Sequence, residues 1–343
     1  MQSQLVQPST IRDTAKLNAS SPGALRALTA WFQLQPTSSP TEAARLTDDL
    51  DRDVYRLAGA GPGGEPIIAK KCSCDEAAQE RLAYTQILPN LRLEPTLRYF
   101  GDVPDSDGKC WMFVEDAGPG AYDMGSPRCR RIAGTWLGRF HASAMIVGKH
   151  PSLCERGTAW FESMLDECRS LVVDVQTAAF LTKDDRRALQ EVRACCDRLA
   201  TRREAIHAIC AATPSTVTHG DLAGRNMRVR ETLVGPTLVV FDWPDVAWGP
   251  PAIDLVISTD QTATDTASPD LEAYCAAVSV AWPDVTRGRV ETLAKVGELF
   301  WHVFALRLDA ASIEPGYVER PISHMADYCN GIMGAMSALG WNK

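Results

Sequence analysis

Hydrophobic positions in the first part of the chain change from helical to strand-like spacing. Apolar residues recur at helical intervals over 24–34, and a segment with two prolines, 36–40, ends that pattern. Short apolar runs at 54–57 and 66–70 predict two strands. The glycine-rich residues 59–64 between them predict a hairpin turn, because glycine permits a positive φ there.

The following segments complete a small β-rich part, after which the pattern becomes mainly helical. Residues 75–88 predict a helix that opens with acidic side chains, and 97–101 and 111–114 predict two strands around a turn at 104–108. Beyond Gly118 we expect helices at 130–147, 161–175, 183–209, 271–281, 289–311 and 324–339, with short β segments at 216–219 and 237–242.

These patterns together predict an α+β protein with two lobes. We expect residues 1–45 to be an N-terminal extension with a short helix, 46–117 a small β-rich lobe, and 118–343 a larger, mainly helical lobe. The polar residues 1–22 are typical of a loose tail, and no apolar segment follows a basic start as in a secretory signal.

Composition narrows the class of protein without deciding its function. Of 343 residues, 45% are hydrophobic and 23% charged, which is ordinary for a globular protein. The net charge of −8 disfavours a nucleic-acid partner, which needs a basic surface, and is compatible with a cationic small molecule. No apolar run approaches the roughly 18 residues of a membrane helix, so we expect no membrane partner and a cytoplasmic location.

The chain carries eleven cysteines, an odd number, most of them in apolar or helical contexts. Without an export signal, these are expected to be reduced thiols. The close pairs Cys72/Cys74 and Cys195/Cys196 lack a second Cys or His pair at zinc-finger spacing, so a structural zinc site is disfavoured.

The strongest chemical signal is His219-Gly220-Asp221-Leu-Ala-Gly-Arg-Asn226, which follows a short apolar strand. A second apolar strand delivers Asp242 sixteen residues after Asn226. Phosphoryl transfer needs one carboxylate to orient and deprotonate the attacking hydroxyl, and oxygen ligands to hold Mg²⁺ on the nucleotide phosphates. The blander alternative is a loop whose Asp and Asn only cap turns. Four fixed positions together with a strand-delivered Asp favour the catalytic interpretation.

These residues, with the segments 241–245 (FDWPD) and 248–255 (WGPPAIDL), resemble the aminoglycoside phosphotransferase and choline kinase group. The resemblance runs from about Leu46 to the end of the chain and implies the protein-kinase-like fold. It implies that Asp221 is the catalytic base and that Asn226 and Asp242 bind Mg²⁺. It also implies structural bracing of the loop by His219 and Asp254. Protein kinases have Arg where this chain has Gly220, which argues against a protein kinase.

The resemblance also implies a lysine that pairs with the nucleotide phosphates. The segment Ile67-Ile68-Ala69-Lys70 matches the kinase strand V-A-I-K, and Lys71 would point to the other face of the strand. The alternative is a pair of solvated lysines at a strand end. We expect Lys70 to pair with Glu80 on the following helix, with Glu76 as the second choice.

Further nucleotide contacts are expected from the segment where the resembled group has its hinge. Backbone groups at Val114, Glu115 and Ala117 would hydrogen-bond the purine of ATP or GTP. Arg225 would offset phosphate charge, with a plain surface position as the alternative. The loop 48–53, where that group covers the phosphates, contains four acids and no glycine and so departs from the pattern.

We therefore expect an ATP- and Mg²⁺-dependent phosphotransferase that acts on a hydroxyl of a small molecule. The preferred acceptor is an aminoglycoside-like or other hydroxylated antibiotic, in resistance or self-protection. A kinase of a primary metabolite such as choline, an amino alcohol, a sugar or a nucleoside is the alternative. A nucleotide-binding pseudoenzyme is the third possibility, and the oligomeric state stays open.

Overall fold

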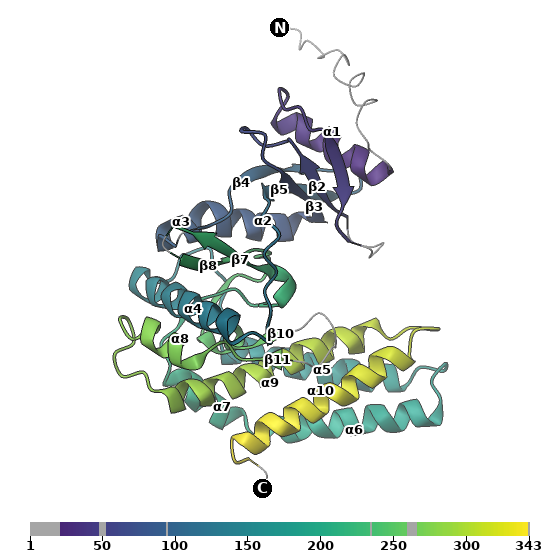
Figure 1. Ribbon diagram of the computed structural model, residues 1–343. Helices are drawn as coiled ribbons and strands as arrows, with labels where there is room; N and C mark the ends of the chain where they lie inside the picture. The colour runs from purple at the N-terminus through teal and green to yellow at the C-terminus, as the bar shows by residue number, and fades with distance from the viewer. Residues whose placement is uncertain (1–20, 48–52, 94, 234, 259–265, 342–343) are drawn as a thin grey trace. The chain divides into compact units, whose positions relative to one another are not determined.

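The computed structural model describes residues 21–47, 53–93, 95–233, 235–258 and 266–341, which form two compact units (Figure 1). Unit 1 holds the described residues up to Pro89 and from Thr96 to Gly118, and unit 2 holds Asn90–Pro95 and the chain from Pro119. The predicted tail, residues 1–22, lies outside the described residues except for Ser21 and Pro22. The functional division at 45/46 and 117/118 stays a prediction.

Unit 1 is built on a five-stranded antiparallel sheet of order β1-β2-β3-β5-β4. Its strands are β1 (Glu42–Arg45), β2 (Val54–Ala58), β3 (Ile67–Ser73), β4 (Tyr99–Pro104) and β5 (Lys109–Glu115). Strands thus form at each segment predicted for this part. The glycine-rich segment is a turn as predicted, in which the Gly64 N–H donates to the Gly61 carbonyl at 2.9 Å.

Helix α1 (Pro22–Leu34) contributes to the core of unit 1. Its Trp31 is fully buried, with ring centroids 5.2 Å from Phe113 and 5.6 Å from Phe100 of the sheet. The Trp31 indole N–H donates to Ser38 Oγ at 2.8 Å, which satisfies its one polar group. The helix that the sequence placed in an extension is therefore packed against this sheet.

Helix α2 (Cys74–Leu82) follows β3 without a loop. Ser73 Oγ accepts from the Glu76 N–H at 3.1 Å, and Glu76 Oε2 accepts from the Ser73 N–H at 2.8 Å. This capping box starts the helix. The predicted helix then continues as a π-helical turn, η3 (Ala83–Ile87), and α3 (Leu88–Leu91).

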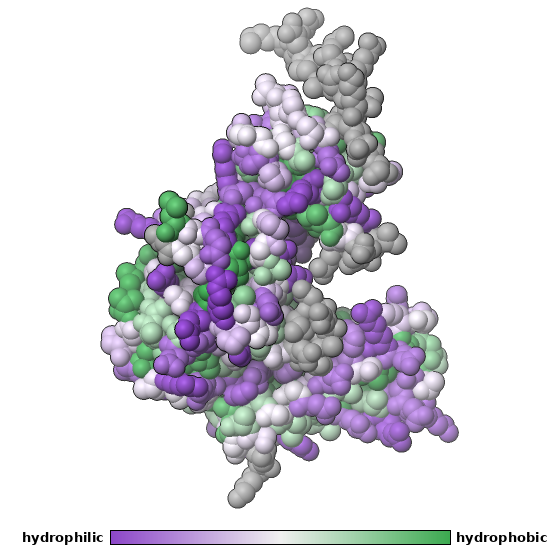
Figure 2. All heavy atoms as spheres, viewed as in Figure 1, coloured by the Kyte–Doolittle hydropathy of each residue, from purple (hydrophilic) through white to green (hydrophobic). Residues whose placement is uncertain are grey.

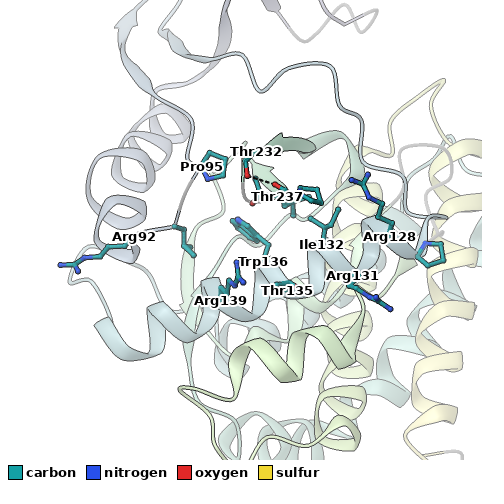
Figure 3. Close-up of a pocket in the computed structure, with 15 residues that line it drawn as sticks. Arg92, Pro95, Arg128, Arg131, Ile132, Thr135, Trp136, Arg139, Thr232 and Thr237 are labelled. Atoms are coloured by element: carbon teal, nitrogen blue, oxygen red, sulfur yellow. Dashed lines mark hydrogen bonds between the residues drawn. The ribbon is translucent and has the colours of Figure 1, made fainter.

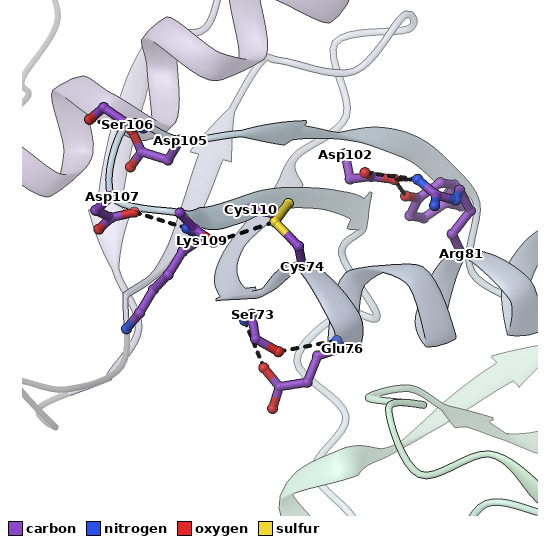
Figure 4. The surroundings of a disulfide bond; sticks show 12 residues. Ser73, Cys74, Glu76, Arg81, Asp102, Asp105, Ser106, Asp107, Lys109 and Cys110 are labelled. Carbon is purple, nitrogen blue, oxygen red and sulfur yellow. Dashed lines mark hydrogen bonds and ion pairs between the residues drawn. A yellow bond between two sulfur atoms is a disulfide. The ribbon is translucent and has the colours of Figure 1, made fainter.

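A disulfide joins Cys74, the first residue of α2, to Cys110 of β5 (Figure 4). The prediction that the thiols are reduced is therefore wrong for this pair. The register of β3 and β5 sets Cys72 opposite Cys110, which brings the Cα atoms of Cys74 and Cys110 to 5.1 Å. Such a separation suits a disulfide. Pairing between two cysteines 36 residues apart is not visible in the sequence pattern.

Unit 2 is mainly helical, with α4 (Pro127–Val147), α5 (Thr158–Gln176), α6 (Lys183–Ala200), α7 (Arg203–Ala211), α8 (Leu271–Val278), α9 (Arg287–Ser312) and α10 (Glu319–Ala338). The helix predicted over 183–209 is broken at Thr201, whose Oγ1 hydrogen-bonds back to the Arg198 carbonyl at 2.7 Å. In the face seen in Figure 2, hydrophilic residues predominate over α6 and α10.

In the described part of the chain, three short strand pairs and two 3₁₀ turns interrupt these helices, and several of them carry the residues of the site described below. The elements are β6 (Thr216–Thr218), η4 (Gly224–Asn226), β7 (Met227–Thr232), β8 (Gly235–Val240), β9 (Ala247–Gly249), η5 (Pro251–Leu255), β10 (Ile257–Ser258) and β11 (Thr266–Ala267). β6 pairs with β9, and β7 pairs with β8. The sequence predicted β6 and β8 but missed β7, in which charged residues surround the two apolar residues, Met227 and Val229.

In unit 2, two pairs of helices approach each other closely because a glycine lies at each contact. A Cβ at Gly138 of α4 would lie 2.6 Å from the Tyr274 carbonyl of α8, so only glycine permits this approach. A Cβ at Gly331 of α10 would lie 2.2 Å from the His302 ring of α9. His302 is buried, and its Nδ1 has no hydrogen-bond partner among the described residues.

Burial lowers the pKa of His302 from its ordinary value of 6.5 to about 4. Between these values the unfolded chain binds a proton at this side chain and the folded chain does not. The contribution of neutral His302 to the free energy of unfolding is therefore complete above pH 6.5. About 3 kcal/mol of it is lost as the pH falls to about 4. Denaturant unfolding from pH 7 to 4 measures it. His302→Gln should flatten the dependence of the unfolding free energy on pH, whereas the exposed control His207→Gln should not. An unchanged pH dependence in His302→Gln would contradict the assignment.

Candidate functional site

The loop after β6 is organised around the buried carboxylate of Asp254 from η5. Asp254 Oδ2 accepts from the His219 N–H at 2.7 Å, and Oδ1 accepts from the Gly220 N–H at 2.9 Å. Charge-assisted bonds of this kind are stronger than neutral ones. They hold the two residues that precede Asp221.

A buried chain of hydrogen bonds supports the same carboxylate from the other side. His141 of α4 lies with Nε2 3.2 Å from Asp254 Oδ2 and Nδ1 3.0 Å from the Tyr274 hydroxyl. Burial raises the pKa of Tyr274 well above its usual value, so its O–H donates to His141 Nδ1 and leaves Nε2–H for Asp254. His141 thus links α4 and α8 to the Asp254 carboxylate.

His219 joins the loop to the end of β8. Its Nδ1 accepts from the Asp221 N–H at 3.3 Å, and its Nε2–H donates to the Phe241 carbonyl at 3.1 Å. The ring packs against Trp243, with centroids 4.4 Å apart. His219 therefore links the segments that carry Asp221 and Asp242.

Gly220 is required by the backbone. Its φ is +89°, and a Cβ would lie 2.7 Å from the Asp245 carbonyl. A residue with a side chain is unfavourable in that conformation. The departure from the H-R-D of protein kinases follows from this local geometry.

The side chains of Asp221, Arg225 and Asn226 lie together. Arg225 Nη2 donates to Asp221 Oδ2 at 2.8 Å. Asn226 Nδ2 donates to the Asp221 carbonyl at 3.1 Å and to Oδ2 at 3.3 Å. Asn226 is buried, whereas the Asp221 side chain is 26% exposed. One oxygen of Asp221, Oδ2, is thus oriented by the loop.

Asp242 lies beside this group through the β7–β8 hairpin. The Phe241 N–H donates to the Asn226 carbonyl at 3.1 Å, so Asn226 and Asp242 flank the same end of the ladder. Asp242 has a φ of +70°, an unusual value for a residue with a side chain. Since Asn226 Nδ2 is used within the loop, Oδ1 of Asn226 and the Asp242 carboxylate are oxygen donors of the kind Mg²⁺ prefers.

Unit 1 carries a separate set of predicted residues. Lys70 Nζ of β3 donates to Glu80 Oε1 of α2 at 2.7 Å, and Glu80 is buried. Lys71 points to the other face, where its Nζ lies 2.6 Å from both Asp105 and Asp107. This pairing lowers the pKa of Asp105 to about 2. Of the two neighbouring lysines, only Lys70 pairs with α2.

The segment expected to bind the purine comprises the last two residues of β5 and the residues that follow it. The Glu115 N–H donates to the Arg98 carbonyl at 2.8 Å, and Val114 is buried in the sheet. Beyond the strand, Asp116 pairs with Arg56 of β2 and accepts from the Gly118 N–H at 2.8 Å. Ala117 lies between these two contacts. The loop 48–53 lies outside the described residues, apart from Asp53.

The sequence profile described as the phosphotransferase enzyme family (APH) matches residues 42–289, more than half of the chain. The chain belongs to this family. The predicted resemblance and the predicted enzyme class are thereby confirmed: the protein is a small-molecule phosphotransferase. No curated protein matches the chain significantly in sequence.

Solved structures similar to this phosphotransferase confirm the predicted α+β, kinase-like fold. A mutant of aminoglycoside 2'-phosphotransferase-IIIa in complex with GDP has a TM-score of 0.60 at 15% identity, over 91% of this chain and 99% of that one. An aminoglycoside phosphotransferase APH(4)-Ia mutant with ADP and hygromycin B has 0.54 at 12%, over 89% and 97%. Choline kinase from Cryptosporidium parvum has 0.53 at 13%, over 88% and 91%.

Two residues that support the site were missed in the sequence. Tyr274 lies 53 positions beyond Asp221 in an unremarkable helix, and nothing in its surroundings marks it. Arg156 donates to Asp245 Oδ1 at 2.7 Å and stacks over Trp160, beneath Gly220. Asp245 was visible in the FDWPD segment, but its partner depends on the tertiary fold.

A pocket of about 930 Å³ in unit 2 contains none of the predicted site residues. It lies between α4, the β7–β8 hairpin and the residues Arg92, Leu93 and Pro95 (Figure 3). Trp136 forms part of its wall, and the side chains of Arg92 and Arg131 point away from Trp136.

Among the described residues, no cluster of three or more His, Cys, Asp or Glu could hold a metal. No helix in the described part of the phosphotransferase is long and apolar enough to span a membrane.

Replacing the buried carboxylate of Asp254 tests the loop directly. Asp254→Asn turns one acceptor oxygen into an amide that faces N–H donors, and we expect it to lower the unfolding free energy by about 3 kcal/mol. Urea unfolding at pH 7 measures the change. The control Asp184→Asn, whose side chain is 88% exposed, should change stability by less than about 0.5 kcal/mol. Equal effects of the two substitutions would contradict the account.

Proposed function

We propose that this phosphotransferase transfers the γ-phosphoryl group of ATP or GTP to a hydroxyl of a small molecule. The observation that carries the proposal is the Asp221 loop. A partly exposed carboxylate is held by Arg225 and Asn226 on a backbone that the buried Asp254 anchors. A loop that only capped turns would not need this arrangement, and a pure nucleotide binder would not need a base.

In the proposed reaction, Asp221 Oδ1 accepts a hydrogen bond from the acceptor hydroxyl and orients its oxygen. That oxygen attacks the γ-phosphorus, the bond from phosphorus to the bridging oxygen breaks, and the nucleoside diphosphate leaves. The hydroxyl proton passes to Asp221 and then to solvent. Arg225 and Asn226 hold the carboxylate in place by engaging Oδ2.

The nucleotide is assigned to the remaining predicted residues. Lys70, oriented by Glu80, would pair with the phosphates, and backbone groups at Val114, Glu115 and Ala117 would contact the purine. Asn226 and Asp242 would hold Mg²⁺, which supplies positive charge to the phosphates when bound. These roles use the side-chain orientations seen within each unit.

For the acceptor we propose a cationic, hydroxylated compound of the aminoglycoside kind. The net charge of −8 favours association with cations, and one structure of the same fold is a complex with hygromycin B. Phosphorylation of such a compound would serve resistance or self-protection in the cytoplasm. Choline, amino alcohols, sugars and nucleosides are the competing acceptors, and choline kinase shares the fold.

A mass-spectrometric screen tests the acceptor. The purified protein is incubated with Mg²⁺, ATP or GTP, and a panel of aminoglycosides, other hydroxylated antibiotics, choline, amino alcohols, sugars and nucleosides. We expect a gain of one phosphate on an aminoglycoside. Phosphorylation of choline or a sugar alone would contradict the acceptor but keep the reaction. Nucleotide binding without any transfer would favour the pseudoenzyme.

Removal of the proposed base separates chemistry from binding. Asp221→Asn should lower kcat by about 10³-fold, because general-base catalysis typically contributes 10² to 10⁴. Nucleotide affinity should change by less than about threefold, since Asp221 is assigned to the acceptor. Steady-state kinetics and calorimetry measure the two quantities, with Asp184→Asn as the control. A kcat within about tenfold of the unsubstituted enzyme would exclude Asp221 as the base.

A further inference from the structure

Helix α2 has few apolar contacts to hold it in place. Its buried residues are Ala77, Glu80 and Leu82, so only two of nine positions contribute apolar burial. Glu80 is also the partner of Lys70, which makes the position of this helix important for the site. The position of α2 therefore depends on its continuation into η3 and α3, where Ala83, Ile87 and Leu88 are buried, and on its ties to the sheet.

Those ties lie at the two ends of the helix (Figure 4). At the C-terminal end, Arg81 Nη1 donates to both oxygens of Asp102 in β4, at 2.8 and 2.9 Å. The Arg81 side chain is 51% exposed, and exposed ion pairs contribute little. At the N-terminal end, the disulfide from Cys74 to Cys110 joins the first turn covalently to β5. It is the strongest tie between α2 and a strand that is not adjacent to it in sequence.

The disulfide is open to exchange from one side only. Cys74 is exposed, whereas Cys110 is buried under the sheet edge. A thiolate from solvent can therefore attack the sulfur of Cys74, and Cys110 departs as the leaving thiolate. The nine other cysteines form no disulfide in the structure, and Cys154 is the exposed one among them.

We propose that the Cys74–Cys110 disulfide is a reversible redox switch that controls nucleotide affinity through the Lys70–Glu80 pair. A dithiol reductant supplies two electrons and two protons, the S–S bond becomes two thiols, and the reductant becomes a disulfide. The first turn of α2 is then released from β5, and Glu80 spends less time beside Lys70. A disulfide oxidant accepts the two electrons and two protons in the reverse exchange and becomes a dithiol, and this restores the bond and the pair. The inference rests on the proposed function, because it assumes that Lys70 binds the nucleotide.

The test compares nucleotide binding by the full chain in the two redox states. Alkylation and intact mass establish the state of the bond, and calorimetry with Mg²⁺ and ATP or GTP gives Kd. We expect reduction to weaken binding by about fivefold to tenfold, an ordinary size for coupling between two sites. Cys74→Ser should bind like the reduced protein in either condition, and the exposed control Cys154→Ser should respond like the unsubstituted chain.

A third variant ties the effect to the proposed route. Glu80→Gln should bind weakly and show no redox response, because the pair that the disulfide maintains is already broken. Equal Kd values in both states, with the bond shown to be cut, would overturn the switch alone. Failure of the bond to form under oxidising conditions would also overturn it. Absence of nucleotide binding in both states would remove the proposed function and this inference with it.

Discussion

The carboxylate of Asp254 is the interaction on which the rest of the candidate site depends. It is fully buried, and both oxygens accept backbone N–H groups from the start of the loop, at 2.7 and 2.9 Å. A buried charge is tolerated only when its hydrogen bonds are satisfied. These two hydrogen bonds therefore restrict the positions of His219 and Gly220, and with them the position of the Asp221 carboxylate that follows.

The hydrogen-bond network around Asp254 extends through the side chains of His141, Tyr274 and His219. His141 brings the Tyr274 hydroxyl into contact with the Asp254 network, and His219 carries the connection to the Phe241 carbonyl at the end of β8. Each imidazole makes hydrogen bonds through both ring nitrogens. The elements that present Asp221 and Asp242 are thus tied together by a polar core.

Much of the fold and of the candidate site could be predicted from the sequence. The features that were missed have identifiable physical causes. The motif around Asp221 was visible because its residues are close in the chain. Glu80 was predicted because the resemblance implies a lysine at Lys70, and its partner was expected to be an acid on the following helix. Strand β7 was missed because its charged residues hide the alternation. Contacts between distant segments, such as Tyr274 with His141 or Cys74 with Cys110, were inaccessible because they depend on tertiary packing and strand register. The expectation of reduced thiols failed for the same reason.

The central claim is that Asp254 acts on the reaction by positioning Asp221. A double-mutant cycle of Asp254→Asn and Asp221→Asn, measured as kcat on the acceptor that the enzyme phosphorylates, tests this most directly. The account predicts strong coupling: once Asp221 is replaced, the second substitution should lower kcat by less than about threefold. Additive losses would show that Asp254 affects the rate independently of Asp221, and they would contradict the account.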